Sequence, residues 1–344
     1  MSELSIRREG RAGRITLTRE DALNALSHDM ALAIEAALRA WQEDASVALV
    51  ILDAAGEKAF CAGGDIREMY ETGRAGNFDY GRTFWRDEYR MNALLAGYPK
   101  PVVSFLQGFV MGGGVGVGCH VSTRVVCEST RIAMPECGIG LVPDVGGSLL
   151  LAQAPGRLGA YLGLTGARMG PGDAIHAGFA DLYLPEADWP AAKAMLCETG
   201  RLAHLEKAGH FAPASRLAEN QDYIDALFAA DSLTEIAEEL AQESGEEIAD
   251  KALKALQAGC PLSMAATLDL LQRLHGETDI RRALELEYRF TARAMEHGDF
   301  IEGIRAQIID RDRKPKWRHE LDVGDEEVAA MLAPLEEELT FAAA

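Results

Sequence analysis

Two carboxylates stand out because the sequence around them carries no other charge. Glu136 and Asp144 lie within residues 134–147, where every other residue is apolar, proline, cysteine or glycine. An apolar setting disfavours the charged form of a carboxyl group and raises its pKa. Paired carboxylates of this kind are a frequent device of acid–base and nucleophilic catalysis. The alternative is structural: one carboxylate caps a helix and the other fixes a loop.

Two glycine-rich loops could supply backbone N–H donors. Gly63 and Gly64 lie in the first loop, residues 60–66, and the second loop, residues 108–118, contains three consecutive glycines at 112–114. Glycine lets the backbone approach a ligand closely and point its N–H groups at it. Such donors suit phosphate, or the oxyanion that forms when an ester or thioester carbonyl is attacked. The alternatives are an ordinary turn for the first loop and close helix–strand packing for the second.

Other signatures of chemistry are missing from the sequence or weak. The second loop is not a P-loop and does not match G-x-G-x-x-G, and neither G-x-S-x-G nor H-E-x-x-H occurs. The six cysteines contain no C-x-x-C pair, which predicts reduced, buried thiols without a zinc site. A dense basic cluster lies at residues 311–318; it either compensates a helix C-terminus or seats ligand phosphates. Its members are Arg311, Arg313, Lys314, Lys316 and Arg318.

Strand-like and helix-like patterns alternate over the first half of the chain. Alternating or continuous apolar runs predict strands at 4–8, 14–18, 47–52, 102–106, 124–127, 131–134 and 179–184. Helical spacing predicts helices at 30–41 behind an N-cap at Ser27, and at 80–96, 147–154, 158–164 and 174–178. This alternation is typical of an α/β fold. After residue 185 the strand signal disappears and helical patterns continue, for example at 280–295 and 326–339, so we expect a boundary near residue 185.

Composition excludes some classes of function. The 344 residues include 34 Lys or Arg and 54 Asp or Glu, a net charge of −20, which argues against binding nucleic acid through its phosphates. No apolar run reaches the length of about 18 residues that a membrane-spanning helix needs. The N-terminus lacks the apolar stretch of a signal peptide, and we expect too little room for a transit peptide before the first strand. With the reduced cysteines, these features predict a cytoplasmic protein.

Taken together, the loops resemble the crotonase, or enoyl-CoA hydratase/isomerase, superfamily. Residues 21–26, 59–66 and 112–114 match its pattern in order and spacing. Residues 111–116, 134–136, 139–141 and 143–147 are similar to its 3-hydroxyisobutyryl-CoA hydrolase branch. Further segments at 164–166, 260–263, 287–289, 300–305 and 314–317 agree, so the resemblance covers nearly the whole chain.

The resemblance implies a fold, a substrate and a set of site residues. The fold is a crotonase-like spiral of ββα turns with the acyl-CoA site over residues 1–185, followed by a C-terminal helical region over 186–344. The amides of Gly64 and Gly113 are expected to form an oxyanion hole. The coenzyme A pocket is expected to include Ala22, Leu23, Ala25, Ala62, Gly63, Asp65, Ile66 and Gly112. Asp21 departs from the basic residue that many relatives carry there. No metal or redox cofactor is implied, and the C-terminal helices could build a homo-oligomer.

Departures from the hydratase pattern indicate the reaction. Hydratases use two glutamates; the second aligns with Glu136, but the first falls at Gly116, which has no side chain. Asp144 replaces a glycine of the hydratases. The resemblance therefore implies hydrolysis of 3-hydroxyisobutyryl-CoA in valine breakdown, with Glu136 attacking the thioester or activating water, and Asp144 positioning the 3-hydroxyl. The rival interpretations are a broad-range enoyl-CoA hydratase or isomerase, and a non-catalytic or RNA-binding relative.

Overall fold

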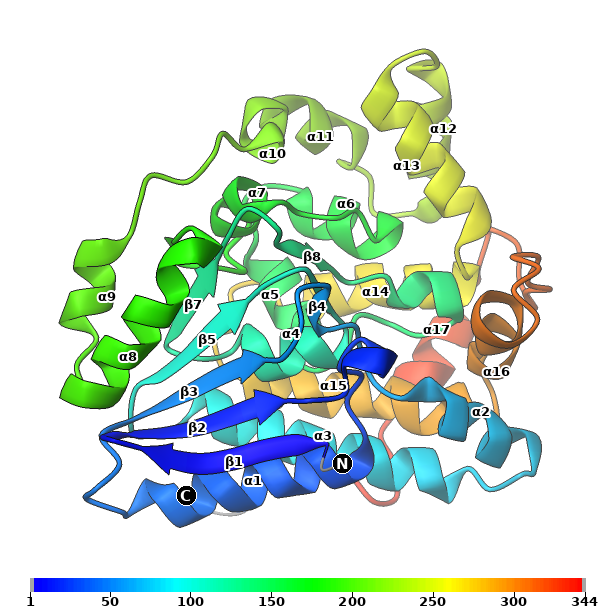
Figure 1. Ribbon diagram of the computed structural model, residues 1–344. Coiled ribbons are helices and arrows are strands. Elements are labelled where there is room, and N and C mark those ends of the chain that lie inside the picture. Colours follow the sequence, from blue (N-terminus) through cyan, green and yellow to red (C-terminus); the bar gives the residue numbers. More distant parts are fainter. Residues whose placement is uncertain (1–2, 342–344) are drawn as a thin grey trace. The chain divides into compact units, whose positions relative to one another are not determined.

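The computed structural model describes residues 3–341, which form two compact units with interleaved chain segments (Figure 1). Unit 1 contains the described residues up to Gly64, together with Arg90–Ala133 and Arg168–Glu219. Unit 2 contains Asp65–Tyr89, Met134–Ala167 and the described residues from Asn220 onward. The units are therefore not consecutive stretches of sequence, and the boundary at residue 185 stays a prediction.

Unit 1 is built from repeated ββα turns that feed two sheets. The larger sheet has the strand order β1-β2-β3-β5-β7-β9, and the smaller one has the order β4-β6-β8. Strands β3, β5 and β7 enter the larger sheet, and the strand that follows each of them enters the smaller sheet. This alternation confirms the predicted α/β spiral. The strands are β1 (Leu4–Glu9), β2 (Ala12–Leu17), β3 (Leu49–Ala54), β4 (Ala59–Cys61), β5 (Val102–Leu106), β6 (Phe109–Met111), β7 (Thr123–Val126), β8 (Arg131–Ala133) and β9 (Leu182–Tyr183).

The strand pairing follows from where the apolar residues lie. The first two predicted strands, β1 and β2, form an antiparallel hairpin, and every other pair in the two sheets is parallel. All five residues of β5 are buried, as parallel strands covered on both faces require. β3 begins two residues later than the predicted 47–52, and β9 keeps only two of the predicted six residues. β4 and β6, with three residues each, overlap the segments 60–66 and 108–118 that were interpreted as glycine loops, so no strand was predicted there.

Helices cover both faces of the larger sheet. α8 (Trp189–Thr199) and α9 (Ala203–Ala208) pack on one face, in a core with residues of β2, β3, β5 and β7 (Figure 1). α1 (His28–Gln42) covers the opposite face, where the Trp41 ring lies so close to Gly13 that a Cβ atom there would be 2.4 Å from it. The predicted N-cap is confirmed, because the Ser27 hydroxyl accepts a hydrogen bond from the Met30 amide.

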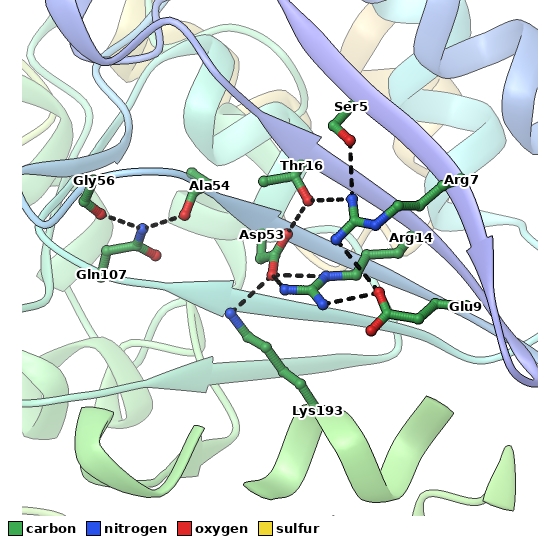
Figure 2. A network of polar contacts seen from close by, with 10 residues as sticks. All are labelled: Ser5, Arg7, Glu9, Arg14, Thr16, Asp53, Ala54, Gly56, Gln107 and Lys193. Carbon is green, nitrogen blue, oxygen red and sulfur yellow. Dashed lines mark hydrogen bonds and ion pairs between the residues drawn. The ribbon is translucent and has the colours of Figure 1, made fainter. Parts of the chain in front are cut away.

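A buried charge cluster ties α8 to the sheet of unit 1 (Figure 2). The carboxylate of Asp53, on β3, is 1% exposed. It accepts ion pairs from Arg14 of β2 at 2.7 Å and from Lys193 of α8 at 2.8 Å, and a hydrogen bond from the Thr16 hydroxyl at 2.7 Å. The Lys193 ammonium also lies 4.7 Å from the centre of the Phe105 ring. Two cations therefore neutralise this single buried acid, and they hold the pKa of Asp53 below its usual value despite its burial.

Helices build unit 2, and its described residues contain no β-strand. α5 (Gly147–Gln153), α6 (Leu158–Thr165) and α14 (Pro261–Arg273) pack against one another, and α15 (Ile280–Ala294) packs on α5 and on α17 (Asp325–Leu332). α15 confirms the predicted helix at 280–295. α17 ends well before the predicted residue 339, because Ala333 is extended and precedes a proline.

The remaining helical segments complete the two units. They are η1 (Glu20–Ala22), α2 (Ile66–Arg74), α3 (Asp79–Ala96), α4 (Gly113–Gly118), η2 (Glu136–Ile139), α7 (Pro171–His176), η3 (Glu186–Asp188), α10 (Arg216–Glu219), α11 (Gln221–Leu227), α12 (Leu233–Gln242), α13 (Glu247–Ala258), α16 (Phe300–Ile304) and the π-helical turn η4 (Arg305–Ile309). No helix within residues 3–341 has the length and apolar character needed to cross a membrane.

Candidate active site

The two predicted glycine loops leave the same edge of the smaller sheet in unit 1. β4 and β6 are parallel neighbours, paired Ala59 to Phe109 and Cys61 to Val110. Gly63 and Gly64 of the first loop follow β4, and the glycines at 112–114 of the second follow β6, so both sets lie at the carboxyl ends of adjacent strands. Gly114 lies so close to β4 that a Cβ atom there would be 2.3 Å from the Cys61 carbonyl oxygen. Only glycine permits this approach, which brings the two loops together.

The conformation of both loops requires glycine and leaves two amides available. Gly63 and Gly112 have φ values of 119° and 46°, in the region that side chains disfavour. Gly113 is the first residue of α4, so its amide has no partner in the helix. In the described part of the chain, neither this amide nor that of Gly64 donates a backbone hydrogen bond in a turn, loop or cap. An anionic oxygen could therefore accept from either amide.

The predicted coenzyme A segment is attached to the first glycine loop. The Ala62 amide donates to the Leu23 carbonyl at 3.1 Å, and the Leu26 amide donates to the Gly63 carbonyl at 2.9 Å. Leu23 and Asn24 both have positive φ values, 52° and 55°, a strained geometry for residues with side chains. The buried Asn24 amide holds this turn in place by donating to the carbonyls of Ala55 and Ala59.

A groove of about 430 Å³ lies beside this segment, within the size range of small-molecule sites. Its lining consists of Glu20, Asp21, Leu23, Asn24 and residues 55–59, in which Lys58 is the single cation. Ala22 is exposed, and Ala25 is half-buried. Of the other predicted coenzyme A residues, Asp65 and Ile66 start the first segment of unit 2, at the beginning of α2.

The Glu136 carboxyl is buried, as its apolar surroundings in the sequence predicted, and one of its two oxygens has no hydrogen-bond partner. Glu136 opens η2 in unit 2 and is 5% exposed, and its Oε2 atom has no hydrogen-bond partner. Burial, followed by the nearby Asp144 carboxylate, raises the pKa of Glu136 well above its usual value. A buried carboxyl oxygen without a hydrogen-bond partner is costly unless a ligand uses it. This cost favours a functional role over a structural one.

Close backbone contacts fix the turn that carries Glu136. The Cys260 amide donates to the Cys137 carbonyl at 2.8 Å. A Cβ atom on Gly303 of α16 would lie 2.1 Å from the Ile139 carbonyl oxygen, so only glycine lets the two segments meet. Gly140 ends the turn with a φ of 78°. Glu136 is therefore held on a rigid backbone.

Asp144 lies in unit 2 on a turn that is strained and firmly held. Its Oδ2 accepts a hydrogen bond from the Tyr89 hydroxyl of α3 at 2.7 Å. The next two residues, Val145 and Gly146, have φ values of 55° and 80°. The Glu287 carboxylate of α15 accepts from the Gly146 amide at 2.8 Å and from both the amide and the hydroxyl of Ser148. A β-branched residue at positive φ is unfavourable, so these bonds define the backbone at Asp144.

Four carboxyl groups of unit 2 influence one another: Glu88, Glu136, Asp144 and Glu287. Each is at most 5% exposed, and none forms an ion pair with Lys or Arg among the described residues. Burial is the main cause that raises the pKa of all four, and neighbouring carboxylates add to it for Glu88, Glu136 and Glu287. The pKa of Asp144 rises to about 7 and that of Glu287 to about 8.

Sequence reasoning found two of these four carboxyl groups and missed their neighbours. Glu88 and Tyr89 lie in a helical pattern beside charged residues, which is typical of a solvated helix face, yet Glu88 is 2% exposed and its Oε1 has no partner. Glu287 appeared only within a family motif. The signal that could have found it is its helical spacing with buried apolar residues of α15.

The structure also shows where the cysteines and the basic cluster lie. All six cysteines are free and buried, as predicted. The basic cluster at 311–318 follows the π-helical turn η4, and its five basic residues are exposed. Within residues 3–341, no group of His, Cys, Asp and Glu side chains has a geometry suited to a metal ion. The absence of a cofactor stays a prediction.

Comparison with known proteins gives consistent results at the level of the family. Residues 12–332 match the model of a family described as enoyl-CoA hydratase/isomerase. A 3-hydroxyisobutyryl-CoA hydrolase of Danio rerio is 38% identical over 332 residues, covering 92% of this chain and 85% of the relative.

Two solved structures are similar to nearly all of the chain. One, described as an enoyl-CoA hydratase from Rhodobacter sphaeroides, is 57% identical, with a TM-score of 0.96 over 99% of this chain and 100% of the other. Another, described as a carnitinyl-CoA dehydratase from Mycobacterium thermoresistibile, is 39% identical, with a TM-score of 0.94 over 99% of both chains.

The predicted cytoplasmic location is contradicted by the comparisons. The hydrolases from Danio rerio, Gallus gallus and Homo sapiens are named as mitochondrial proteins. The reasoning failed because free, buried thiols indicate a reducing compartment, and this condition is not specific to the cytoplasm.

Proposed function

The chain belongs to the enoyl-CoA hydratase/isomerase family, and we propose that within it the protein is a thioester hydrolase that converts 3-hydroxyisobutyryl-CoA to 3-hydroxyisobutyrate and coenzyme A. The observation that carries the proposal is the pair Glu136 and Asp144, both buried and neither paired with a cation. Relatives named as 3-hydroxyisobutyryl-CoA hydrolases support the substrate.

In this proposal the glycine loops bind the thioester oxygen. The amides of Gly64 and Gly113 donate to it and stabilise the negative charge that develops when the carbonyl carbon is attacked. Removing one such donor typically costs about 10²–10³ in rate. The segment 22–25 and residues 62–66 and 112 contact the coenzyme A part of the substrate, and the nearby groove supplies room for it.

Glu136 acts as the nucleophile. Its ionised carboxylate attacks the thioester carbon, the oxyanion collapses, and the thiolate leaves to give an acyl-enzyme anhydride. Water then opens the anhydride to release the product acid and restore the carboxylate, and the released thiolate takes up a proton. Splitting hydrolysis in this way replaces one difficult step with two easier ones. Since burial raises the pKa of Glu136, activity increases with pH as this group loses its proton.

Asp144 accepts a hydrogen bond from the 3-hydroxyl of the substrate and assists proton transfer. The chain's own residues supply each of these steps, and coenzyme A is part of the substrate, so we propose no metal or redox cofactor. The oligomeric state stays open in this proposal, although the C-terminal helices could form a homo-oligomer.

Hydration of an enoyl-CoA is the second candidate, favoured by the likeness to the Rhodobacter sphaeroides protein, which is described as a hydratase. Against it stands Gly116, buried in α4, where a hydratase needs its first glutamate. Loss of one acid–base group typically costs about 10²–10⁴ in rate.

One experiment separates the two reactions. Purified protein is incubated with 3-hydroxyisobutyryl-CoA, 3-hydroxypropionyl-CoA and crotonyl-CoA, while free thiol and loss of the enoyl absorbance are both recorded. We expect thiol release from the hydroxyacyl substrates and little or no hydration of crotonyl-CoA. Efficient hydration without thiol release would contradict the hydrolase proposal.

A single-turnover reaction in water labelled with heavy oxygen tests the nucleophile. If water opens the anhydride at the enzyme's carbonyl, label enters the Glu136 carboxylate. A direct attack by water on the substrate places label in the product acid alone. Label in the peptide that contains Glu136 would therefore establish the covalent route.

A further inference from the structure

The Tyr89 hydroxyl has two side-chain partners, and Asp144 is the nearer one. Its oxygen lies 2.7 Å from Oδ2 of Asp144 and 3.4 Å from the Thr291 hydroxyl, and all three side chains are buried. The Tyr89 ring packs edge-on against Tyr288, with the ring centres 6.2 Å apart. The ring therefore has no room to swing away, and the hydroxyl keeps its direction toward the carboxylate.

The backbone beneath Asp144 is fixed independently of its side chain. Glu287 accepts hydrogen bonds from the Gly146 and Ser148 amides, and the Gly147 amide donates to the Asp144 carbonyl at 2.7 Å. Because the backbone is fixed in this way, the remaining variable is the side-chain torsion that rotates the Asp144 carboxylate. A terminal carboxylate torsion is broad and roughly two-fold, so a hydrogen bond is needed to select one orientation.

We propose that Tyr89 is a positioning residue that orients the Asp144 carboxylate toward the 3-hydroxyl of the acyl chain and so creates the enzyme's preference for hydroxylated substrates. The inference rests on the proposed thioester hydrolysis. Tyr89 itself does not contact the reacting atoms; it acts through Asp144.

The charges around Asp144 make the effect of Tyr89 visible in a pH profile. The titratable groups that face Asp144 are Glu88 and Tyr89 on α3, Glu136 on η2, and Glu287 on α15. Burial favours the protonated form of Asp144, whereas the hydrogen bond from Tyr89 favours the ionised form and lowers its pKa. Removing the Tyr89 hydroxyl therefore raises the pKa of Asp144. In a plot of kcat/KM against pH, the part of the curve that reflects the ionisation of Asp144, its pH limb, moves to higher pH.

The test is Tyr89→Phe, with Tyr288→Phe as the matched control. The control removes a hydroxyl from the ring that packs on Tyr89, but that hydroxyl contacts Arg86 and the Arg82 carbonyl and makes no contact with Asp144. For both variants, kcat and KM are measured across pH with 3-hydroxyisobutyryl-CoA and with isobutyryl-CoA, which lacks the hydroxyl. Melting temperatures show whether each variant is folded.

We expect Tyr89→Phe to lower kcat/KM for the hydroxylated substrate by about tenfold, the size of one hydrogen bond to a charged group, with a much smaller loss on isobutyryl-CoA. The pH limb moves up by about one unit. Tyr288→Phe leaves both the limb and the substrate preference unchanged. In an Asp144→Asn background, Tyr89→Phe adds little further loss of preference, because the two groups act as one unit.

Equal losses on both substrates, or a pH limb that does not move in folded Tyr89→Phe, would overturn the proposal. Such a result is distinguishable from failure of the proposed function, because in that case the unmodified protein releases no thiol from either substrate.

Discussion

The same type of side chain meets opposite environments in the two units. In unit 1, Asp53 is 1% exposed and contacts Arg14 and Lys193, and its pKa lies below the usual value (Figure 2). In unit 2, Glu136 and Asp144 are almost as deeply buried, contact no cation, and have raised pKa values. Burial alone therefore does not determine the charge of an acid; the partners that the fold supplies do.

Under the proposed function, this difference separates an acid that stabilises the fold from acids that act on the substrate. A buried acid with two cations is satisfied, and it stabilises the sheet and α8 of unit 1. An acid without partners costs stability, and proteins keep such groups where they function. We therefore expect opposite results from removing the two kinds of acid: a loss of activity for the acids of unit 2, and a loss of stability for Asp53 of unit 1.

The largest expected effect is on activity, from Glu136→Gln. This variant keeps the shape of the side chain but removes the nucleophile, so we expect kcat to fall by at least about 10³-fold. Stability should be equal or slightly higher, because a buried carboxyl without a partner is replaced by a neutral group. Thiol-release kinetics and chemical denaturation measure the two quantities. A clear loss of stability would show that Glu136 has a structural role as well.

The reverse pattern is expected for Asp53→Asn in unit 1. Arg14 and Lys193 lose their buried counter-charge, and breaking a buried ion pair on one side typically costs about 3–5 kcal/mol. The activity of the molecules that remain folded should change little. Thr16→Val is the matched control, because it removes the hydrogen bonds of the Thr16 hydroxyl to Asp53 at 2.7 Å and from Arg7 at 3.1 Å and leaves both ion pairs of Asp53 in place. A loss for the control as large as that for Asp53→Asn would place the stabilisation in the hydrogen bond.

The two kinds of acid should also give opposite dependences of stability on pH. The folded pKa of Asp53 is depressed, so its contribution is present above the unfolded pKa of about 3.9 and is lost as the pH falls through the folded value. The folded pKa of Asp144 is raised to about 7, so the folded state loses stability as the pH rises from about 4 to that value.

Denaturation of Asp144→Asn over a pH series tests the second half of this statement. Because asparagine does not ionise, the stability of the variant relative to the unmodified protein should increase between about pH 4 and pH 7. A difference that is constant over this range would mean that Asp144 ionises in the folded protein as easily as in water.

The sequence predicted the buried carboxyl groups of the candidate site better than it predicted the residues that contact them. Glu136 and Asp144 were recognisable because an apolar surrounding is a local property of the chain. Tyr89 was not, because its role depends on α3 approaching a turn 55 residues further along the chain. The strands of the larger sheet were found from alternating or continuous apolar runs, whereas β4 and β6 were missed because they overlap segments whose glycines indicated loops.

The smallest expected effect concerns Cys61, the last residue of β4, which leads into the first glycine loop. Its thiol is fully buried, and its Sγ lies 3.5 Å from the Gly63 carbonyl oxygen. Since the proposed mechanism uses no thiol, Cys61→Ser should change kcat/KM by less than about threefold, with a stability loss of about 1 kcal/mol from burying a hydroxyl.

Gly113→Pro provides the contrast, because proline is tolerated at a first helical position but has no N–H to donate. We expect that variant to lose about 10²–10³ in kcat. If folded Cys61→Ser were as inactive as Gly113→Pro, a cysteine nucleophile in unit 1 would have to replace the carboxylate of unit 2 as the attacking group.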